Sequence, residues 1–131
     1  MKSIFKAVSM TTAVIALSTT ISFASDLSGV VKSGETALGN ILTDTAGMTL
    51  YTFDKDANGK SACNGGCAKA WPPLLVKTKT PETGDYTKIT RDDGNKQWAY
   101  KGKPLYGWVK DTKPGDVTGD KFKGVWHIVK P

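Results

Sequence analysis

The chain has 131 residues, of which 39% are hydrophobic and 23% charged, and its formal net charge is +6. This length suits one small domain with a modest core. The positive charge is small and carried by scattered lysines, which argues against the dense basic patch of a nucleic-acid-binding protein. Attraction to anionic envelope polymers or lipid surfaces stays open.

The first 24 residues have the three parts of a signal peptide. Lys2 and Lys6 give a positive start, residues 7–21 are mostly apolar or small, and the SFA sequence that ends at Ala24 suits signal peptidase. No second apolar run approaches a membrane span, so we expect a mature chain of residues 25–131 without a transmembrane segment. No cysteine follows the cleavage site, so we expect a periplasmic or secreted protein without a lipid anchor.

The mature chain repeats itself at an offset of 55 residues, and we call residues related by this offset repeat equivalents. Eight identities need no gap: Gly39/Gly94, Asn40/Asn95, Gly47/Gly102, Leu50/Leu105, Tyr51/Tyr106, Lys55/Lys110, Asp56/Asp111 and Trp71/Trp126. Phe53 also aligns with Trp108, an aromatic replacement. Units that cannot bury an apolar face alone pack against a twin. We therefore predict one domain with pseudo-twofold symmetry, with repeat one at about 37–76 and repeat two at about 92–131.

Most of the predicted elements are strands. In chain order they are GMTLYTF at 47–53, YTKIT at 86–90, a hairpin KQWAYKGKPLYGWV at 96–109 and GVWHIVK at 124–130. The hairpin should turn near Lys101 and Gly102. One short helical turn is expected near Cys67–Trp71, because the two prolines that follow prevent a longer helix. The predicted fold is mainly β, a single compact domain built from two pseudo-twofold β-hairpin repeats.

These motifs resemble a known family. YTFDKD at 51–56 and YGWVKD at 106–111 are similar to the Y-x-[FWY]-x-x-D signature of bacterial secreted repeat proteins, often called predicted lipoproteins with a Y-x4-D motif. The resemblance extends to GKSACNGGCAKAWPPL, RDDGNKQWAYKGKPLY and DTKPGDVTGD, and so to almost all of the mature chain. It implies no activity, substrate or cofactor. The chain departs from the lipoprotein pattern in lacking a lipidation cysteine.

The cysteines of an exported chain are expected to form a disulfide. Cys63 and Cys67 are the only two, and the glycines between them allow a tight ring. Closing so short a loop contributes about 2 kcal/mol. The alternative is a redox-active pair, but the spacing is not C-x-x-C and no βαβ context surrounds it. A zinc site would lack ligands, since the chain has one histidine.

A calcium site is a second alternative for this loop. Asp54, Asp56 and Asn58 open a D-x-D-x-N-G pattern, but the twelfth position, where an EF-hand needs glutamate, is Gly65. Only Asp56 has an acidic repeat equivalent, Asp111. We expect both to accept backbone N–H bonds where the chain leaves a strand.

A second acidic loop, DTKPGDVTGD, contains Asp111, Asp116 and Asp120. We interpret these side chains as caps of their own turn-rich backbone. A cation held by them is the alternative.

The aromatic residues divide into two groups. Trp71 and Trp126 are repeat equivalents, as are Phe53 and Trp108, which favours symmetric core positions over an exposed stripe. Trp98 and Tyr100 have no aromatic equivalents and are the candidates for surface recognition. His127 is interpreted as a structural residue of a strand.

No catalytic constellation is recognisable, because no nucleophile motif surrounds any serine. We expect a non-enzymatic, exported, disulfide-stapled β domain that acts as an envelope-associated binding or interaction module without a cofactor. Its partner would be an envelope component and not a nucleic acid. The alternative is a metal- or redox-linked periplasmic accessory protein that uses Cys63 and Cys67 or the Asp-rich loops. The residues common to both repeats are Gly47, Leu50, Tyr51, Phe53, Asp56 and Trp71, with Gly102, Leu105, Tyr106, Trp108, Asp111 and Trp126.

Overall fold

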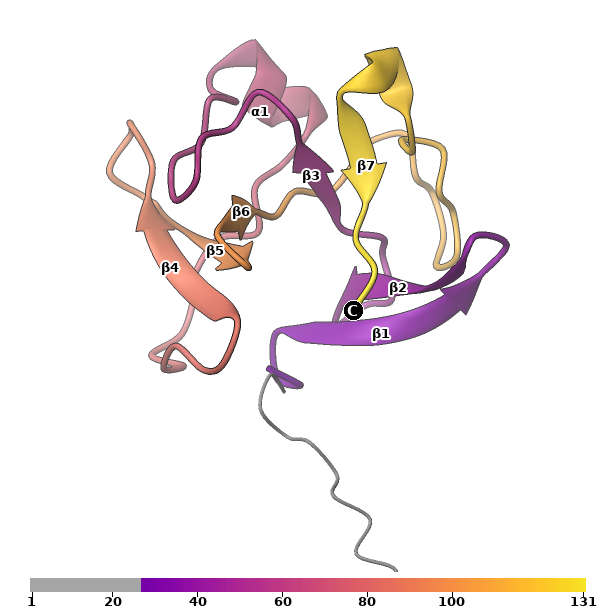
Figure 1. Ribbon diagram of the computed structural model, residues 1–131, viewed down its shortest axis with the longest axis horizontal. Helices are drawn as coiled ribbons and strands as arrows, with labels where there is room; N and C mark the ends of the chain where they lie inside the picture. The colour runs from indigo at the N-terminus through magenta and orange to yellow at the C-terminus, as the bar shows by residue number, and fades with distance from the viewer. Residues whose placement is uncertain (1–26) are drawn as a thin grey trace, which may run out of the picture.

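The structure is a computed structural model that describes residues 27–131 (Figure 1). The predicted signal peptide and its cleavage after Ala24 lie outside these residues. The elements are β1 Val31–Thr36, β2 Gly39–Asp44, β3 Tyr51–Phe53, α1 Gly66–Ala70, β4 Tyr86–Thr90, β5 Lys96–Tyr100, β6 Lys103–Pro104, the 3-10 turn η1 Phe122–Gly124 and β7 Trp126–Ile128. The fold is mainly β with one short helical turn, as predicted.

Two repeat-equivalent hairpins form the outer parts of the domain. β1 pairs antiparallel with β2, and β4 pairs antiparallel with β5. β6 adds a third strand to the second hairpin, through a turn at Lys101 and Gly102 as predicted. Both turn residues have positive φ, 50° and 81°, which gives a two-residue turn the twist of its strands. The sequence prediction missed the β1–β2 hairpin, because Gly34 and Glu35 in β1 are poor strand formers.

The central strands are exchanged between the repeats. β3 of the first repeat pairs with β7 of the second, with Phe53 opposite Trp126, and the two strands lie side by side in Figure 1. The equivalent pairing joins Tyr106 to Pro73, and the Gly107 N–H donates to the Pro72 carbonyl at 2.8 Å. Each repeat therefore completes the sheet of the other.

The pseudo-twofold axis passes between Tyr51 and Tyr106. Each backbone N–H of this pair donates to the carbonyl of the other residue, at 2.7 and 2.9 Å. Because these bonds and the exchanged strands all cross between repeats, one repeat alone would leave its central strand unpaired. The two repeats form one domain.

The core consists of two clusters. The first packs the hairpins together through Leu42, Leu50, Leu105 and other apolar side chains. The second contains Tyr51, Cys63, Trp71, Tyr106 and Trp126 around the axis. Trp71 and Trp126 are 4% and 3% exposed, so their prediction as symmetric core residues is confirmed. Phe53 and Trp108, for which the same was predicted, are only partly buried and pack against this cluster.

One prediction about the aromatic residues is wrong. Trp98 and Tyr100 are only 1% and 7% exposed and belong to the first core cluster, so they do not form a recognition surface. Their repeat equivalents are Thr43 and Thr45, and this difference in residue type does not imply a difference in exposure.

In residues 27–131 no helix is long and apolar enough to cross a membrane.

Candidate functional site

The Tyr and Asp of the shared motif bond across the repeats and not within one motif. The Tyr51 hydroxyl donates to Asp111 Oδ2 at 2.7 Å, and the Tyr106 hydroxyl donates to Asp56 Oδ2 at 2.6 Å. The other carboxylate oxygens accept backbone N–H bonds, Asp56 from Ala62 and Asp111 from Thr118. The predicted capping by both aspartates is confirmed. The crossing was not foreseen, because the sequence does not say which tyrosine meets which aspartate.

The surroundings of these pairs keep the proton on the phenol. Burial raises the pKa of Tyr51 and of Tyr106 well above the usual value, and the bonds to Asp111 and Asp56 raise them further. Burial also raises the pKa of the Asp56 carboxyl, against the lowering effect of the Ala62 and Tyr106 hydrogen bonds. The pairs therefore act as fixed donor and acceptor contacts that join the repeats.

The residues of the calcium alternative point to separate partners. Asp54 pairs with His127, whose Nε2 lies 2.8 Å from Asp54 Oδ2. Asp56 is occupied by Tyr106 and Ala62, and Asn58 lies against Gly102. Within residues 27–131 no group of three His, Cys, Asp or Glu side chains could hold a metal ion.

Asp111 and Asp116 cap the backbone of the second acidic loop, as interpreted from the sequence, whereas Asp120 bonds to strand β7 outside the loop. Asp116 accepts the backbone N–H bonds of Thr112 and Lys113, and the first of these is the main cause of its lowered pKa. Asp120 accepts the Ile128 N–H at 3.0 Å. The repeat equivalent of Ile128 is Pro73, which has no N–H, and the equivalent of Asp120 is glycine. The aspartate is therefore present only in the repeat where the facing residue has a backbone N–H to donate.

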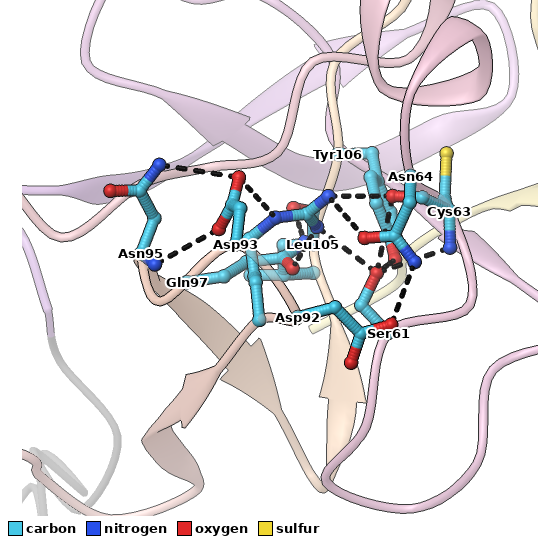
Figure 2. Close-up of polar contacts among 10 residues, drawn as sticks. Ser61, Cys63, Asn64, Asp92, Asp93, Asn95, Gln97, Leu105 and Tyr106 are labelled. Atoms are coloured by element: carbon cyan, nitrogen blue, oxygen red, sulfur yellow. Dashed lines mark hydrogen bonds and ion pairs between the residues drawn. The ribbon is translucent and has the colours of Figure 1, made fainter.

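The predicted disulfide between Cys63 and Cys67 is formed. Beside it lies Arg91, the only arginine of the chain, with a residue exposure of 4%. Its guanidinium donates to the Cys63 carbonyl at 2.6 Å, to Gln97 Oε1 at 2.8 Å and to Ser61 Oγ at 3.0 Å (Figure 2).

Arg91 was not identified from the sequence. Its Nε forms no hydrogen bond and lies 4.0 Å from an oxygen of the exposed Asp93. Its repeat equivalent is Thr36, so the contact exists in one repeat only. A single arginine in a lysine-rich chain was the available signal, since its planar fork suits several carbonyl acceptors at once.

Four aromatic rings form one continuous stack through the axis. The Trp71 ring lies 3.8 Å from Trp108 on one side and 3.8 Å from Trp126 on the other, and Phe53 stacks on Trp126 at 4.2 Å. The inner rings are repeat equivalents, and so are the outer rings. Exchange of β3 and β7 brings them together, because Phe53 and Trp126 are paired in the sheet.

A groove of about 410 Å³ runs along this stack, and we call it the dyad groove. Eight of its lining residues form four repeat-equivalent pairs: Phe53/Trp108, Trp71/Trp126, Ala70/Val125 and Cys67/Phe122. The remaining two lining residues are both lysines, Lys55 and Lys123, and their repeat equivalents do not line the groove. The groove is therefore apolar along its length and positively charged at two asymmetric points.

Comparison with known proteins agrees with this two-repeat architecture. A family described as a secreted repeat of unknown function matches residues 32–75 and 87–130. The chain belongs to this secreted-repeat family. The two matched segments are offset by the same 55 residues. They include all but the first residue of β1 and of β4, two strands that begin before the repeat starts assigned from the sequence. No curated protein and no solved structure matches the chain. The family description supports a periplasmic or extracellular location.

The secreted-repeat domain also has two side grooves at repeat-equivalent places. The larger, about 670 Å³, is lined by Pro72, Pro73 and Val109 among others. At the equivalent positions, His127, Ile128 and Asp54 line a groove of about 260 Å³. Equivalent backbone positions therefore carry apolar residues in one side groove and the hydrogen-bonded Asp54–His127 pair in the other.

Proposed function

We propose that this secreted repeat is a non-enzymatic, disulfide-stapled β domain that acts as a binding module of the cell envelope, with the dyad groove as its binding site. The observation that carries the proposal is an aromatic surface left open at the centre of the fold. Phe122 at its wall is 36% exposed, although apolar core partners lie next to it. The groove volume lies within the range of about 300–1,000 Å³ that ligand sites occupy.

The occupation of the polar side chains supports a non-enzymatic role. Asp56 and Asp111 are each held by a tyrosine and a backbone N–H, and Asp54 is paired with His127. General acid or base catalysis needs a group that is free to reach a substrate proton. Each of these three carboxylates is therefore held by contacts within the fold.

Native mass spectrometry of the mature protein, purified from its own envelope, tests the proposal. We expect a bound small molecule on the wild type and its loss from Phe122→Ala, which removes one wall of the groove. Val109→Asp is the matched control. It changes another exposed apolar side chain, and its repeat equivalent is already an aspartate, so the fold accommodates the change.

Two results would contradict the proposal. One is an adduct that persists in Phe122→Ala and disappears in Val109→Asp, which would place binding in the side groove. The other is turnover of hydrolase or thiol-oxidoreductase substrates that a point substitution abolishes.

A redox-linked accessory role is the second candidate, and one observation favours it. Cys67 lines the dyad groove, whereas Cys63 is fully buried. A redox role requires a disulfide potential well above the value of about −300 mV below which structural bridges lie. Measurement against glutathione buffers of known potential would decide between the two candidates.

A further inference from the structure

We infer that the ligand of the dyad groove is a small aromatic anion, a flat ring system that carries one carboxylate, sulfonate or phosphate group. This inference rests on the proposed function and specifies the chemistry of the same site.

The charge around the groove has one sign. Lys55 and Lys123 are its only charged lining residues, and both are exposed. Neither forms an ion pair within residues 27–131. An anion held there is attracted by the lysines and meets no lining carboxylate. Lys123 has Ala68 as its repeat equivalent, and Lys110, the equivalent of Lys55, lies outside the groove, so the two charges belong to this groove and not to the repeat pattern.

The aromatic stack presents ring edges to the groove. The Trp71 ring has Trp108 on one face and Trp126 on the other, and its residue is only 4% exposed, so the groove meets its edge. Ring edges carry partial positive charge and ring faces partial negative charge. A ligand ring can therefore place its negative face on these edges while its anionic group reaches a lysine. A neutral or cationic ligand would gain no electrostatic attraction to the lysines.

The backbone of the wall supports a role beyond folding. Lys121 and Lys123, on either side of Phe122, have positive φ values of 61° and 50°. Left-handed backbone is unfavourable for a lysine, and such residues concentrate at binding sites. Here the conformation places Phe122 and Lys123 together at the groove, with Lys123 Nζ 5.7 Å from the Phe122 ring centre.

Two fluorescent probes that share an aromatic framework test the ligand class. 8-Anilino-1-naphthalenesulfonate carries a sulfonate, and N-phenyl-1-naphthylamine is its neutral counterpart. We expect the anionic probe to bind the wild type more tightly, with an affinity that falls as salt is raised, since exposed charges are screened. The neutral probe should show no salt dependence.

Lysine substitutions locate the charge effect. Lys55→Gln and Lys123→Gln should each weaken the anionic probe about two- to fivefold, and the double variant about tenfold, while the neutral probe is unchanged. Lys110→Gln is the matched control, because Lys110 is the repeat equivalent of Lys55, is exposed and lies outside the groove. All three positions are surface lysines, and thermal melting checks that each of the four variants remains folded.

The ring requirement is tested by competition between two monocarboxylates. 1-Naphthoate should displace the bound anionic probe at lower concentration than decanoate. A better displacement by decanoate would overturn the aromatic part of the inference.

The remaining outcomes separate the ligand class from the site. If Phe122→Ala weakens both probes but the lysine variants change neither, the ligand class is refuted and the binding module stands. If Phe122→Ala changes neither probe, or Val109→Asp weakens both, the dyad groove is not the site and both proposals fail.

Discussion

In the two Y-x4-D motifs, each tyrosine bonds to the aspartate of the other motif. This arrangement predicts which tyrosine and aspartate are energetically coupled, and bonding within each motif would predict the opposite pairs. If Tyr51 acts through Asp111 and not through Asp56, the energetic coupling must follow the contact across the repeats. Tyr51→Phe removes a buried hydroxyl that donates to a carboxylate at 2.7 Å and accepts the Gly119 N–H at 3.2 Å. A hydrogen bond to a charged group contributes about 1.5–3 kcal/mol, and the unpaired N–H adds to the cost. We expect a loss of about 3 kcal/mol.

Double-mutant cycles measure the coupling directly. The cycle of Tyr51→Phe with Asp111→Ala should give a coupling energy of about 1.5–2.5 kcal/mol, because the two side chains touch. The cycle of Tyr51→Phe with Asp56→Ala should give less than about 0.5 kcal/mol, since Asp56 bonds to Tyr106 instead. The Tyr106 cycles should show the opposite pattern.

Urea unfolding followed by tryptophan fluorescence supplies the free energies. With a urea slope of about 1.5 kcal/mol/M, a loss of 3 kcal/mol moves the midpoint by about 2 M. Trimethylamine N-oxide keeps the double variants folded if they become marginal, because it favours the compact state. A larger coupling for Tyr51 with Asp56 than for Tyr51 with Asp111 would refute the exchanged arrangement.

Four further predictions follow from individual contacts. The raised pKa values of the two phenols of the Tyr–Asp pairs mean that above about pH 10 the unfolded chain releases protons that the folded chain keeps, so stability should fall with pH by up to about 1.4 kcal/mol per unit for each phenol. Urea midpoints between pH 9 and 11.5 should show this slope, and it should be smaller in the Tyr51→Phe variant; an equal slope in the variant would contradict it. Replacing Cys63 and Cys67 by alanine should cost about 2 kcal/mol and leave the β circular dichroism spectrum intact, whereas complete unfolding would show that the loop does more than close a ring. Arg91→Lys, which loses the planar fork, should cost about 2–3 kcal/mol in urea unfolding, and a loss below about 0.5 kcal/mol would show that its four acceptors are satisfied without it. Lys101→Asn should raise stability by about 0.5–1 kcal/mol, because Lys101 has a φ of 50° before a glycine in a two-residue turn where asparagine is preferred, and a lower melting temperature would refute this.

The fold class and the pseudo-symmetry could be predicted because both follow from the types of residue at each position. The 55-residue offset needs only identities such as Trp71/Trp126, and the strand pattern needs only the alternation around residues 96–109. The exchange of β3 and β7 could not be predicted. Two repeats that pair within themselves and two that pair with each other have the same local propensities, and only the long-range contacts differ.

The site was recognised only in part for a related reason. The sequence indicates which side chains are aromatic or charged, but exposure depends on which face the partner repeat covers. Trp98 is predicted at the surface and is buried, whereas Phe122, which no sequence pattern singles out, forms an exposed wall of the dyad groove. Arg91 contacts the cysteine loop from 28 residues away, a separation at which a sequence pattern gives no information.

The asymmetry of the disulfide has a physical explanation in the two aspartate loops. In the second repeat, Asp111 Oδ1 accepts both the backbone N–H and the hydroxyl of Thr118, which fixes that loop without a covalent bond. The repeat equivalent of Thr118 is Cys63, and Asp56 accepts only the backbone N–H of Ala62 from its loop.

The first repeat therefore lacks one charge-assisted hydrogen bond at this position. The bond from Cys63 to Cys67 and the contact from Arg91 to the Cys63 carbonyl hold the same stretch of chain. Cys67 also occupies the position where the other repeat has Phe122. One wall of the dyad groove therefore carries a small disulfide-bonded side chain and the opposite wall a large aromatic one. The disulfide is thus linked to the shape of the groove as well as to the stability of the loop, and this gives a reason for the two repeats to differ here.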